Sequence, residues 1–458
     1  MSINDMFAFQ NVGLPEDILR LKHHGDYENA IRLIDFRLQE DDLPRSLRCC
    51  LQLQREMMVR MPAEFPYSYE EALAIIRQHI PDFSVEEFDR IIAQRKIRWC
   101  YVNGEFRIFN RFFSSLVKAY KGFAQRANQT LLGVESTVGG VPLLEYSMQT
   151  MKKNGSMSNS IRIRAAAKVK DEVFEPGMFV RVHLPIPSAC EQQSDIRIEN
   201  IFPANGQIAP EDAPQRTVCW ETELAENCEF SVEYSYTHTA RYRDLDSAVG
   251  EAGVYDFDLE EQEPHIVFTP YIRSLVEELT EGVEDPLAKA RIFYDFITQN
   301  MSYTFMPSYF TLENIPDTCA RNFTGDCGVF ALLFLTLCRC AGIPAQWQSG
   351  LTAEPDFCGA HDWVRFYVAP FGWLYVDCSY GISAHRNENE ERRKFYFGNL
   401  DPYRMVANRA FAAPFTVDKA FWRADPYDNQ LGEMETADRG LTYEEFDRSK
   451  EVLSCEEI

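Results

Sequence analysis

Apolar residues recur at helical spacing along much of the first 130 residues. Between Asp26 and Gln39 they lie three and four positions apart, as on one face of an amphipathic helix. These positions are Tyr27, Ala30, Ile31, Ile34 and Leu38. The pair Ser68 and Glu71 has the spacing of a capping box and predicts the start of a second helix. A third start is predicted at Ser84.

A hairpin follows these helices. In Arg98 to Asn110 the dipeptide Asn103-Gly104 divides two aromatic-rich runs, which is a strong signal for a two-residue turn between strands. Helices followed by a hairpin resemble a winged helix. Residues 1–130 carry 18 basic and 18 acidic side chains, so this region lacks the positive charge of a typical DNA-binding unit. We therefore expect it to pack against neighbouring parts or to bind protein.

The pattern changes to short strands after Gly155. Several runs alternate with a period of two, and Pro, Gly and Asn occupy the gaps between them. The predicted strands are Ser160 to Lys168, Met178 to Leu184, Asp195 to Phe202, Arg216 to Glu223 and Cys228 to Thr237. We interpret residues 131–262 as an antiparallel β-sandwich of Ig-like size.

Helical spacing returns at Pro270 to Leu279 and at Pro286 to Met301, where a third unit, 263–400, begins. The remainder, 401–458, starts with an aromatic, proline-bearing stretch that we expect to wrap this unit. From Leu431 onward nine acidic residues face three basic ones, which favours a helix or a loose acidic tail. The fold class is thus multi-domain α+β.

Charge and composition narrow the possible functions. Acidic residues number 70 and basic residues 46, and the net charge of −24 lies wholly in residues 131–458. This charge repels nucleic acid and anionic membranes and favours basic or neutral substrates. The sequence shows no secretory signal and no apolar run long enough to cross a membrane, so we predict a cytoplasmic protein. Its thirteen cysteines are then expected to be reduced.

One of these cysteines begins an apolar helix. Asp326 can cap this helix, its middle is apolar nearly all round, and Gly342 and Pro344 mark its end. Cys327 therefore lies in the first turn of a buried helix, where the helix dipole and free N–H groups stabilise a thiolate. We predict that Cys327 is a nucleophile with a lowered pKa.

A histidine and an aspartate lie where they could serve this thiol. His361 begins an aromatic strand, Pro370-Phe371-Gly372 forms a turn, and Asp377 ends the returning strand. The two side chains meet at the open end of the predicted hairpin, so the carboxylate can orient the imidazole. Asp362 is the alternative acid, but it is adjacent to His361 on the same strand, so its side chain is expected on the opposite face of the sheet.

These motifs resemble the transglutaminase-like superfamily over about residues 265–400. The matching elements are Gly325-Asp326-Cys327, Ala341-Gly342-Ile343-Pro344-Ala345, His361 with Trp363 and Tyr367, Gly372-Trp373 and Val376-Asp377. The resemblance implies a papain-like α+β core and a Cys-His-Asp triad for acyl transfer from an amide. It makes Cys327 the nucleophile, His361 the base and Asp377 the orienting acid.

The sequence also departs from the family pattern. Arg365 stands where members often have glutamate, and Cys378-Ser379 where Pro-Thr often follows the acid. These differences put the substrate contacts in doubt and leave the triad intact. The oxyanion hole should include the backbone N–H of Cys327. Tyr303 is a candidate second donor, and Trp363 a candidate substrate contact.

The remaining candidates for chemistry are weak. Cys358 and His361 are spaced as two zinc ligands, but two more are not evident, and no nucleotide-binding glycine motif is present. We expect no metal and no cofactor. We predict a peptide or protein substrate, with hydrolysis favoured over glutamine cross-linking. A non-catalytic peptide-binding scaffold is the rival from another class, and the oligomeric state stays open.

Overall fold

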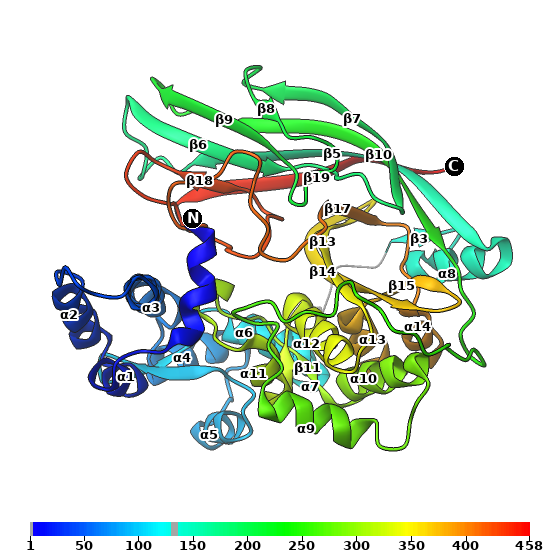
Figure 1. Cartoon of the computed structure of the whole chain (residues 1–458), viewed down its shortest axis with the longest axis horizontal. Helices are drawn as coiled ribbons and strands as arrows, with labels where there is room; N and C mark the ends of the chain where they lie inside the picture. Colours follow the sequence, from blue (N-terminus) through cyan, green and yellow to red (C-terminus); the bar gives the residue numbers. More distant parts are fainter. Residues whose placement is uncertain (1–2, 130–135) are drawn as a thin grey trace.

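The computed structural model describes residues 3–129 and 136–458. Three bodies are arranged around one centre: a helical N-terminal region, a pair of stacked sheets, and a mixed α/β core (Figure 1). The C-terminal strand forms the edge of one of the stacked sheets, beside the strand Ser156–Val169 from far earlier in the chain.

The N-terminal region is helical, as the apolar spacing predicts. Asp26 caps the helix found at the first predicted stripe, and both predicted capping boxes are formed, with Ser68 and Ser84 as the caps. The elements are a 3-10 helix Asn4–Val12, α1 Glu16–His23, α2 Tyr27–Arg37, α3 Arg45–Glu64, α4 Tyr69–His79, α5 Val85–Ala93, α6 Phe112–Ala119 and α7 Lys121–Arg126.

The predicted hairpin forms between α5 and α6. Strands β1 (Trp99–Val102) and β2 (Glu105–Ile108) pair antiparallel, with Val102 opposite Glu105. Asn103 and Gly104 both have positive φ, at 51° and 86°, which a type I′ turn requires and which these two residue types tolerate best. The closer likeness to a winged helix stays a prediction.

Two four-stranded sheets follow. The five predicted strands are all present, and the short β8 and two strands from the end of the chain complete the two sheets. After the short β3 (Thr137–Val138), β4 (Val141–Pro142) and α8 (Leu143–Asn154), the strands are β5 Ser156–Val169, β6 Met178–Pro185, β7 Gln193–Phe202, β8 Gln207–Ile208, β9 Thr217–Leu224 and β10 Phe230–Arg241. Residues of both sheets share one hydrophobic cluster. The Ig-like description stays a prediction.

The acidic C-terminal stretch is neither a helix nor a loose tail, so that expectation is wrong. Its residues form β18 (Glu433–Glu435) and β19 (Phe446–Glu457), which complete the two sheets in the orders β18-β6-β9-β8 and β19-β5-β10-β7. Most acidic side chains of β19 point outward, while Phe446 is buried. Charge on one face of a strand is compatible with a buried opposite face.

The core contains a five-stranded antiparallel sheet in the order β16-β15-β14-β13-β17. Its elements are α9 Pro270–Leu279, α10 Pro286–Asn300, β11 Ser302–Tyr303, a 3-10 helix Tyr309–Thr311, α11 Ile315–Asn322, β12 Thr324–Gly325, α12 Cys327–Cys340, β13 Ala345–Glu354, β14 Phe357–Val368, β15 Gly372–Val376, α13 Cys378–Arg386, α14 Glu390–Phe395, β16 Phe397–Gly398 and β17 Arg404–Asn408. The helices predicted around 270–301 are confirmed.

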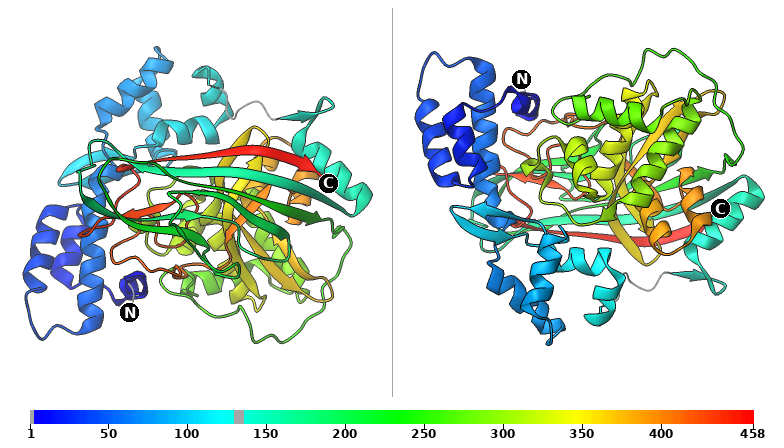
Figure 2. Two further views of the ribbon diagram at one scale, coloured as in Figure 1. Left: turned by 90° about the horizontal axis from the view of Figure 1, so that it is seen from above. Right: turned by 90° about the horizontal axis from the view of Figure 1, so that it is seen from below.

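Helix α12 is buried in the centre of this core. Eleven of its fourteen residues are buried, and Gly342 follows its end with φ of 80°, as the helix punctuation predicts. The opposite face of the core sheet contacts the stacked sheets, because Leu351 of β13 and Met405 of β17 belong to their hydrophobic cluster. Figure 2 shows the core sheet lying between its own helices and the stacked sheets.

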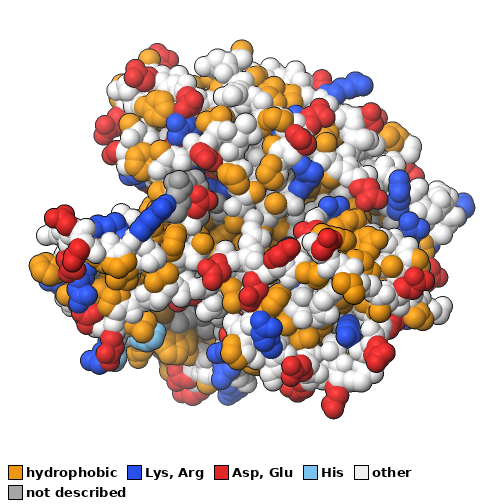
Figure 3. Space-filling model, in the orientation of Figure 1, with side chains coloured by type: hydrophobic (Ala, Val, Ile, Leu, Met, Phe, Trp, Pro, Cys, Tyr) orange, Lys and Arg blue, Asp and Glu red, His pale blue; other side chains and the backbone are white. Residues whose placement is uncertain are grey.

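On the face shown in Figure 3, acidic and basic side chains are interspersed, so the net negative charge does not form one continuous patch there. In the part of the chain that the structure describes, no helix combines the length and the apolar composition needed to cross a bilayer. The prediction of a cytoplasmic location stays a prediction.

Candidate active site

Cys327 begins helix α12 at the edge of the core. Asp326 caps the helix by accepting a hydrogen bond from Val329 N at 3.2 Å, and it also accepts one from the hydroxyl of Tyr309. The sequence prediction of this cap is confirmed. Cys327 is partly accessible, whereas Gly328 and the helix beyond it are buried. The first turn is therefore the end of α12 that a substrate can reach.

The thiol of Cys327 contacts two oxygen atoms. Its Sγ donates to Oδ2 of Asp362 at 3.2 Å, and the phenol of Tyr303 hydrogen-bonds to the same sulfur. Burial raises the pKa of the Cys327 thiol well above its usual value, and Asp362 raises it further. The predicted lowering of this pKa by the helix dipole is therefore wrong: burial and a neighbouring carboxylate outweigh the dipole.

His361 and Asp377 form a tight pair at the open end of the β14–β15 hairpin. His361 Nε2 lies 2.6 Å from Asp377 Oδ2, and since a carboxylate only accepts, Nε2 carries the proton. Burial lowers the pKa of His361 below its usual value although Asp377 opposes this shift. The imidazole is therefore neutral near pH 7, and its Nδ1 keeps a lone pair that can accept a proton.

Asp377 is held by more than the histidine. Its Oδ2 also accepts from Arg404 Nη1 at 2.9 Å, and its Oδ1 accepts from Tyr380 N at 2.9 Å and from Ser379 Oγ at 3.0 Å. Burial would raise the pKa of Asp377, but His361 and Arg404 hold it well below its usual range. The carboxylate is therefore ionised and fixed in orientation.

Arg404 is a site residue that the sequence analysis missed. It comes from β17, in the segment expected only to wrap the core, and its side chain is fully buried. Asp401 provides a second carboxylate for the same guanidinium. The sequence does carry a signal for this buried ion pair: Arg404 begins the otherwise apolar run 404–407 and follows Asp401 by three residues.

The thiol and the imidazole do not touch in this structure. Within residues 3–129 and 136–458, the polar partners of Cys327 are Asp362 and Tyr303, and that of the His361 ring is Asp377. Strand alternation explains the arrangement. Asp362 shares its face of β14 with Phe366, which packs against Phe334 of α12 at a ring distance of 5.6 Å. The α12 side of the strand is thus the Asp362 side.

Asp362, set aside in the sequence analysis, is therefore the carboxyl group nearest the thiol. Gln430 fixes Asp362 through its Nε2, which donates one hydrogen bond to Asp362 Oδ1 and another, at 3.0 Å, to the backbone oxygen of His361. Asp362 also shares a hydrogen bond with the Asp428 carboxyl, and burial and this neighbour raise the pKa of Asp362 well above its usual value. The same alternation that excluded Asp362 as partner of His361 could have placed it beside Cys327.

The two further candidates lie in different environments. The hydroxyl of Tyr303 hydrogen-bonds to the sulfur of Cys327, and its role as an oxyanion donor stays a prediction. Trp363 is 1% exposed, its indole Nε1 donates to Gln348 Oε1 at 2.8 Å, and its ring lies 6.1 Å from that of His361. In this arrangement Trp363 supports the histidine and presents no surface to a substrate.

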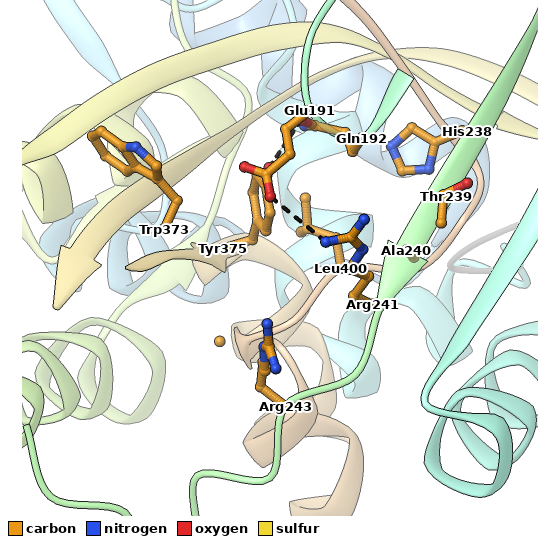
Figure 4. Close-up of a pocket in the computed structure, with 11 residues that line it drawn as sticks. Glu191, Gln192, His238, Thr239, Ala240, Arg241, Arg243, Trp373, Tyr375 and Leu400 are labelled. Carbon is orange, nitrogen blue, oxygen red and sulfur yellow. Dashed lines mark hydrogen bonds and ion pairs between the residues drawn. The ribbon is translucent and has the colours of Figure 1, made fainter. Parts of the chain in front are cut away.

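Other features of the structure do not compete as a site. No group of three or more potential metal ligands occurs in the described part of the chain. A pocket of about 40 Å³ lies between the stacked sheets and the core (Figure 4). Its lining includes Gln192, His238 and Tyr375 but neither Cys327 nor His361. This pocket is a gap at the boundary of two bodies, with room for one or two water molecules.

Part of the core is similar to known proteins. Residues 273–378 match the model of the transglutaminase-like superfamily. A protein-glutamine gamma-glutamyltransferase of Pseudomonas aeruginosa is 28% identical over 130 residues, which are 26% of this chain and 20% of that protein. The uncharacterized protein YebA of Bacillus subtilis is 24% identical over 131 residues, 24% of this chain and 18% of its own length. The similarity thus spans about a fifth of the length of these relatives.

Solved structures with a similar chain course include a cysteine protease candidate from Cytophaga hutchinsonii, at 15% identity and a TM-score of 0.43, covering 66% of this chain and 91% of that one. The periplasmic domain of TgpA from Pseudomonas aeruginosa aligns at 14% identity with a TM-score of 0.29, over 54% of this chain and 96% of that domain.

Proposed function

We propose, because residues 273–378 of this chain are a core of the transglutaminase-like superfamily, that the protein is a cysteine-dependent enzyme that transfers acyl groups from amides. Cys327 is the proposed nucleophile, His361 the base and Asp377 the group that orients the base. The observation that carries the proposal is the locked pair of His361 and Asp377, at 2.6 Å, with His361 on the strand whose next residue, Asp362, bonds to the thiol of Cys327.

The proposed reaction begins when the thiol proton of Cys327 passes to Nδ1 of His361 and the sulfur attacks the substrate carbonyl. A C–S bond forms, and the carbonyl electrons move onto oxygen. As the tetrahedral intermediate collapses, the C–N bond breaks and the leaving amine takes the proton from the imidazolium. Water or an amine then attacks the thioester, giving up a proton to His361, and restores the thiol.

This proposal requires a movement, because the thiol is bound to Asp362 at rest. The sulfur has to leave Asp362 and meet the imidazole when a substrate enters. The backbone N–H of Cys327 is proposed as one oxyanion donor, and the hydroxyl of Tyr303, already at the sulfur, as the other. Asp377 contributes by keeping the Nε2 proton in place, so that Nδ1 always faces the reaction as an acceptor.

The test is trapping of the acyl-enzyme. An electrophilic peptide library should label Cys327, and mass spectrometry of the adducts should show the preferred side chains. With a peptide built from that preference, we expect Cys327→Ala to abolish turnover and Asp377→Asn to lower kcat by about a hundredfold or more, through the wrong imidazole tautomer. Full turnover by Cys327→Ala would contradict the proposal.

Hydrolysis is the proposed outcome of the second step, and amine transfer the alternative. The two reactions share the thioester and differ in the acceptor. The same peptide, incubated with and without a primary amine, separates them. Release of free acid at a rate that does not depend on the amine supports hydrolysis, whereas incorporation of the amine in place of acid formation supports transfer.

A second candidate function is a non-catalytic peptide-binding scaffold. It is favoured by one observation: the thiol of Cys327 hydrogen-bonds to Asp362 and not to His361, and Gln430 in turn hydrogen-bonds to Asp362. A scaffold would bind a peptide equally well as the wild type and as Cys327→Ala, and would turn over none. Trapping of a thioester at Cys327 would exclude this role.

A further inference from the structure

Unpaired positive charges lie around the proposed nucleophile. The segment 95–121, from the N-terminal region, holds seven basic residues and one acidic residue, in a chain of net charge −24. This segment packs on the strands that lead to Cys327: Arg98 Nη2 donates to Thr324 Oγ1 at 2.8 Å, and Phe305 N donates to Ser115 Oγ at 3.1 Å. The charge-balanced N-terminal third thus places its basic part at the site.

Lys118 of α6 is a basic group that interacts electrostatically with Cys327. Its Nζ lies 4.1 Å from the ring centre of Tyr303, the residue whose hydroxyl bonds to Cys327. Burial lowers the pKa of Lys118, and the charge of Cys327 acts on it in the opposite direction, which places the two groups within electrostatic reach. Among the residues that the structure describes, no carboxylate forms an ion pair with Lys118.

Two further cations adjoin Lys118. Arg386, at the end of α13, donates through Nη1 to the backbone oxygen of Lys118, and its Nε is buried with no hydrogen-bond partner in the described structure. Arg111, just before α6, lies 3.5 Å above the ring of Phe305. Neither guanidinium has a carboxylate partner within residues 3–129 and 136–458.

Lys118 and Arg386 are partly buried and Arg111 is exposed, and their lack of a carboxylate partner contrasts with two fully buried cations of the protein. Arg404 is paired with Asp377 and Asp401, and Lys419 lies 2.9 Å from Glu433. A chain with 70 acidic residues has ample means to neutralise a cation, and even partial burial of a charge without a counter-ion costs hydration free energy. The partly buried Lys118 and Arg386, which have no carboxylate partner in the described structure, therefore favour a site whose anion comes from outside the chain.

We propose that Lys118 and Arg386 form a carboxylate-binding subsite next to Cys327, so that the amide substrate carries a carboxylate close to the bond that is cleaved. The claim about the substrate rests on the proposed function, whereas binding of a carboxylate at the subsite does not require turnover. Arg111 borders the subsite from the other side of Phe305. A substrate that carries a carboxylate is the opposite of the basic or neutral substrate expected from the net charge.

The first test uses two alkylating probes that differ in one group. Iodoacetate and iodoacetamide both form a thioether at Cys327 with loss of iodide, but only iodoacetate carries a carboxylate. The ratio of their rates at Cys327, read by mass spectrometry of its peptide, cancels any change in the thiol itself. We expect the ratio to exceed that of a small free thiol by about fivefold at low salt, and to fall as salt screens the charges.

Variants locate the effect. Lys118→Gln and Arg386→Gln should each lower the ratio by about threefold, whereas Lys118→Arg should keep it, because the charge remains. Lys96→Gln is the matched control: Lys96 also stands over a tyrosine ring, at 4.7 Å from that of Tyr120, but has no contact with Cys327. The salt dependence of the wild-type ratio needs no variant and stands even if one of them fails to fold.

The results separate the two proposals. A wild-type ratio equal to that of a free thiol at every salt concentration, or a ratio that Lys118→Gln leaves unchanged, overturns the subsite whether or not the enzyme is active. A high, salt-sensitive ratio in a protein that never forms a thioester leaves the subsite in place and overturns the enzyme function.

The source of the carboxylate is a second question, answered with peptide substrates. A glutamate-to-glutamine pair tests an acidic side chain, and a pair with C-terminal acid or amide tests the chain end. The subsite predicts a rise of KM for one neutral member with wild-type protein, and no such rise with Lys118→Gln. Equal KM values within both pairs would contradict it.

Discussion

At the scale of single residues, Asp362 decides the resting state of the nucleophile. Its carboxyl accepts the thiol proton of Cys327 at 3.2 Å and is itself fixed by Gln430. A neighbouring negative charge and a hydrogen bond to the neutral thiol both disfavour the thiolate. The helix start alone suggested a reactive thiolate, so the tertiary neighbour reverses the conclusion drawn from local sequence.

We predict that Asp362→Asn makes Cys327 more reactive. The substitution removes the carboxyl group that accepts the thiol proton and that repels the thiolate when ionised, so the pKa of Cys327 falls from its raised value. At pH values below that pKa, the thiolate fraction rises as the pKa falls. A fall of about one unit makes alkylation by iodoacetamide near pH 7 about tenfold faster and moves the midpoint of its pH profile to lower pH.

The control for this change is Asp356→Asn, at the exposed turn between β13 and β14. We expect its pH profile to coincide with that of the wild type. A profile for Asp362→Asn that is unchanged, or displaced to higher pH, would show that Asp362 does not hold the thiol proton.

At the scale of elements, the C-terminal strand shows where composition misleads. Nine acidic residues favoured a helix or loose tail, yet β19 pairs along β5 from Phe446↔Val169 to Glu457↔Asn159. A strand needs only one apolar face, and a single buried aromatic residue with a long partner strand suffices to fix it. Neither the partner nor the register of pairing is visible in the local sequence.

We predict that the two faces of β19 differ in their contribution to stability. Phe446 is 1% exposed and belongs to the cluster shared by the stacked sheets. Phe446→Ala should lower the free energy of unfolding by about 3 to 5 kcal/mol, because it leaves a cavity. Leu453, 40% exposed on the same strand, is the control. Leu453→Ala should change the free energy of unfolding by at most about 0.5 kcal/mol. Urea unfolding measures both, and equal losses would contradict the buried placement of β19.

Elements with strong local punctuation were predicted well. The capping boxes at Ser68 and Ser84, the turn at Asn103-Gly104 and the cap at Asp326 depend on contacts within about four residues. The hairpin that joins His361 to Asp377 is also local, because its turn fixes which residues meet. These elements needed no knowledge of the rest of the fold.

At the scale of the whole molecule, the stacked sheets support the site in the core. Gln192, which directly precedes β7, donates Nε2 to Gln348 Oε1 at 2.7 Å, and the same Gln348 oxygen accepts from Trp363. Gln192 also accepts from the hydroxyl of Tyr375 at 2.9 Å, a contact visible in Figure 4. Because Trp363 stacks beside His361, this buried chain of hydrogen bonds connects one body to the histidine of another.

We predict that the boundary between the bodies depends on Gln192. Gln192→Ala removes one hydrogen bond from Gln348 Oε1 and one from the hydroxyl of Tyr375, and should cost about 1 to 3 kcal/mol of unfolding free energy. The adjacent Glu191 is the control: it faces Arg241 at 4.0 Å, and both side chains are more than half exposed. Glu191→Gln should have an effect close to zero. Thermal unfolding of the two variants tests the difference, and similar midpoints would contradict a role for the buried chain.

The sequence alone determined the parts of this protein that rest on neighbours in the chain. It predicted the helix that begins at Cys327, the pairing of His361 with Asp377, the capped helices and hairpin of the N-terminal region and five strands of the stacked sheets. These follow from caps, turns and periodicity, whose forces act over a few residues. The motifs also indicated the transglutaminase-like superfamily, whose model residues 273–378 match.

The tertiary structure decided the state of the site. It brought Asp362 to the thiol, Arg404 to Asp377 and Lys118 to Tyr303, from segments far apart in the chain. Whether a thiol is ionised, a carboxylate neutralised or a cation left free depends on burial and on charges a few ångströms away in space. Those neighbours are fixed only when the chain has folded, because no local pattern records which distant side chain will fill the space beside a given residue.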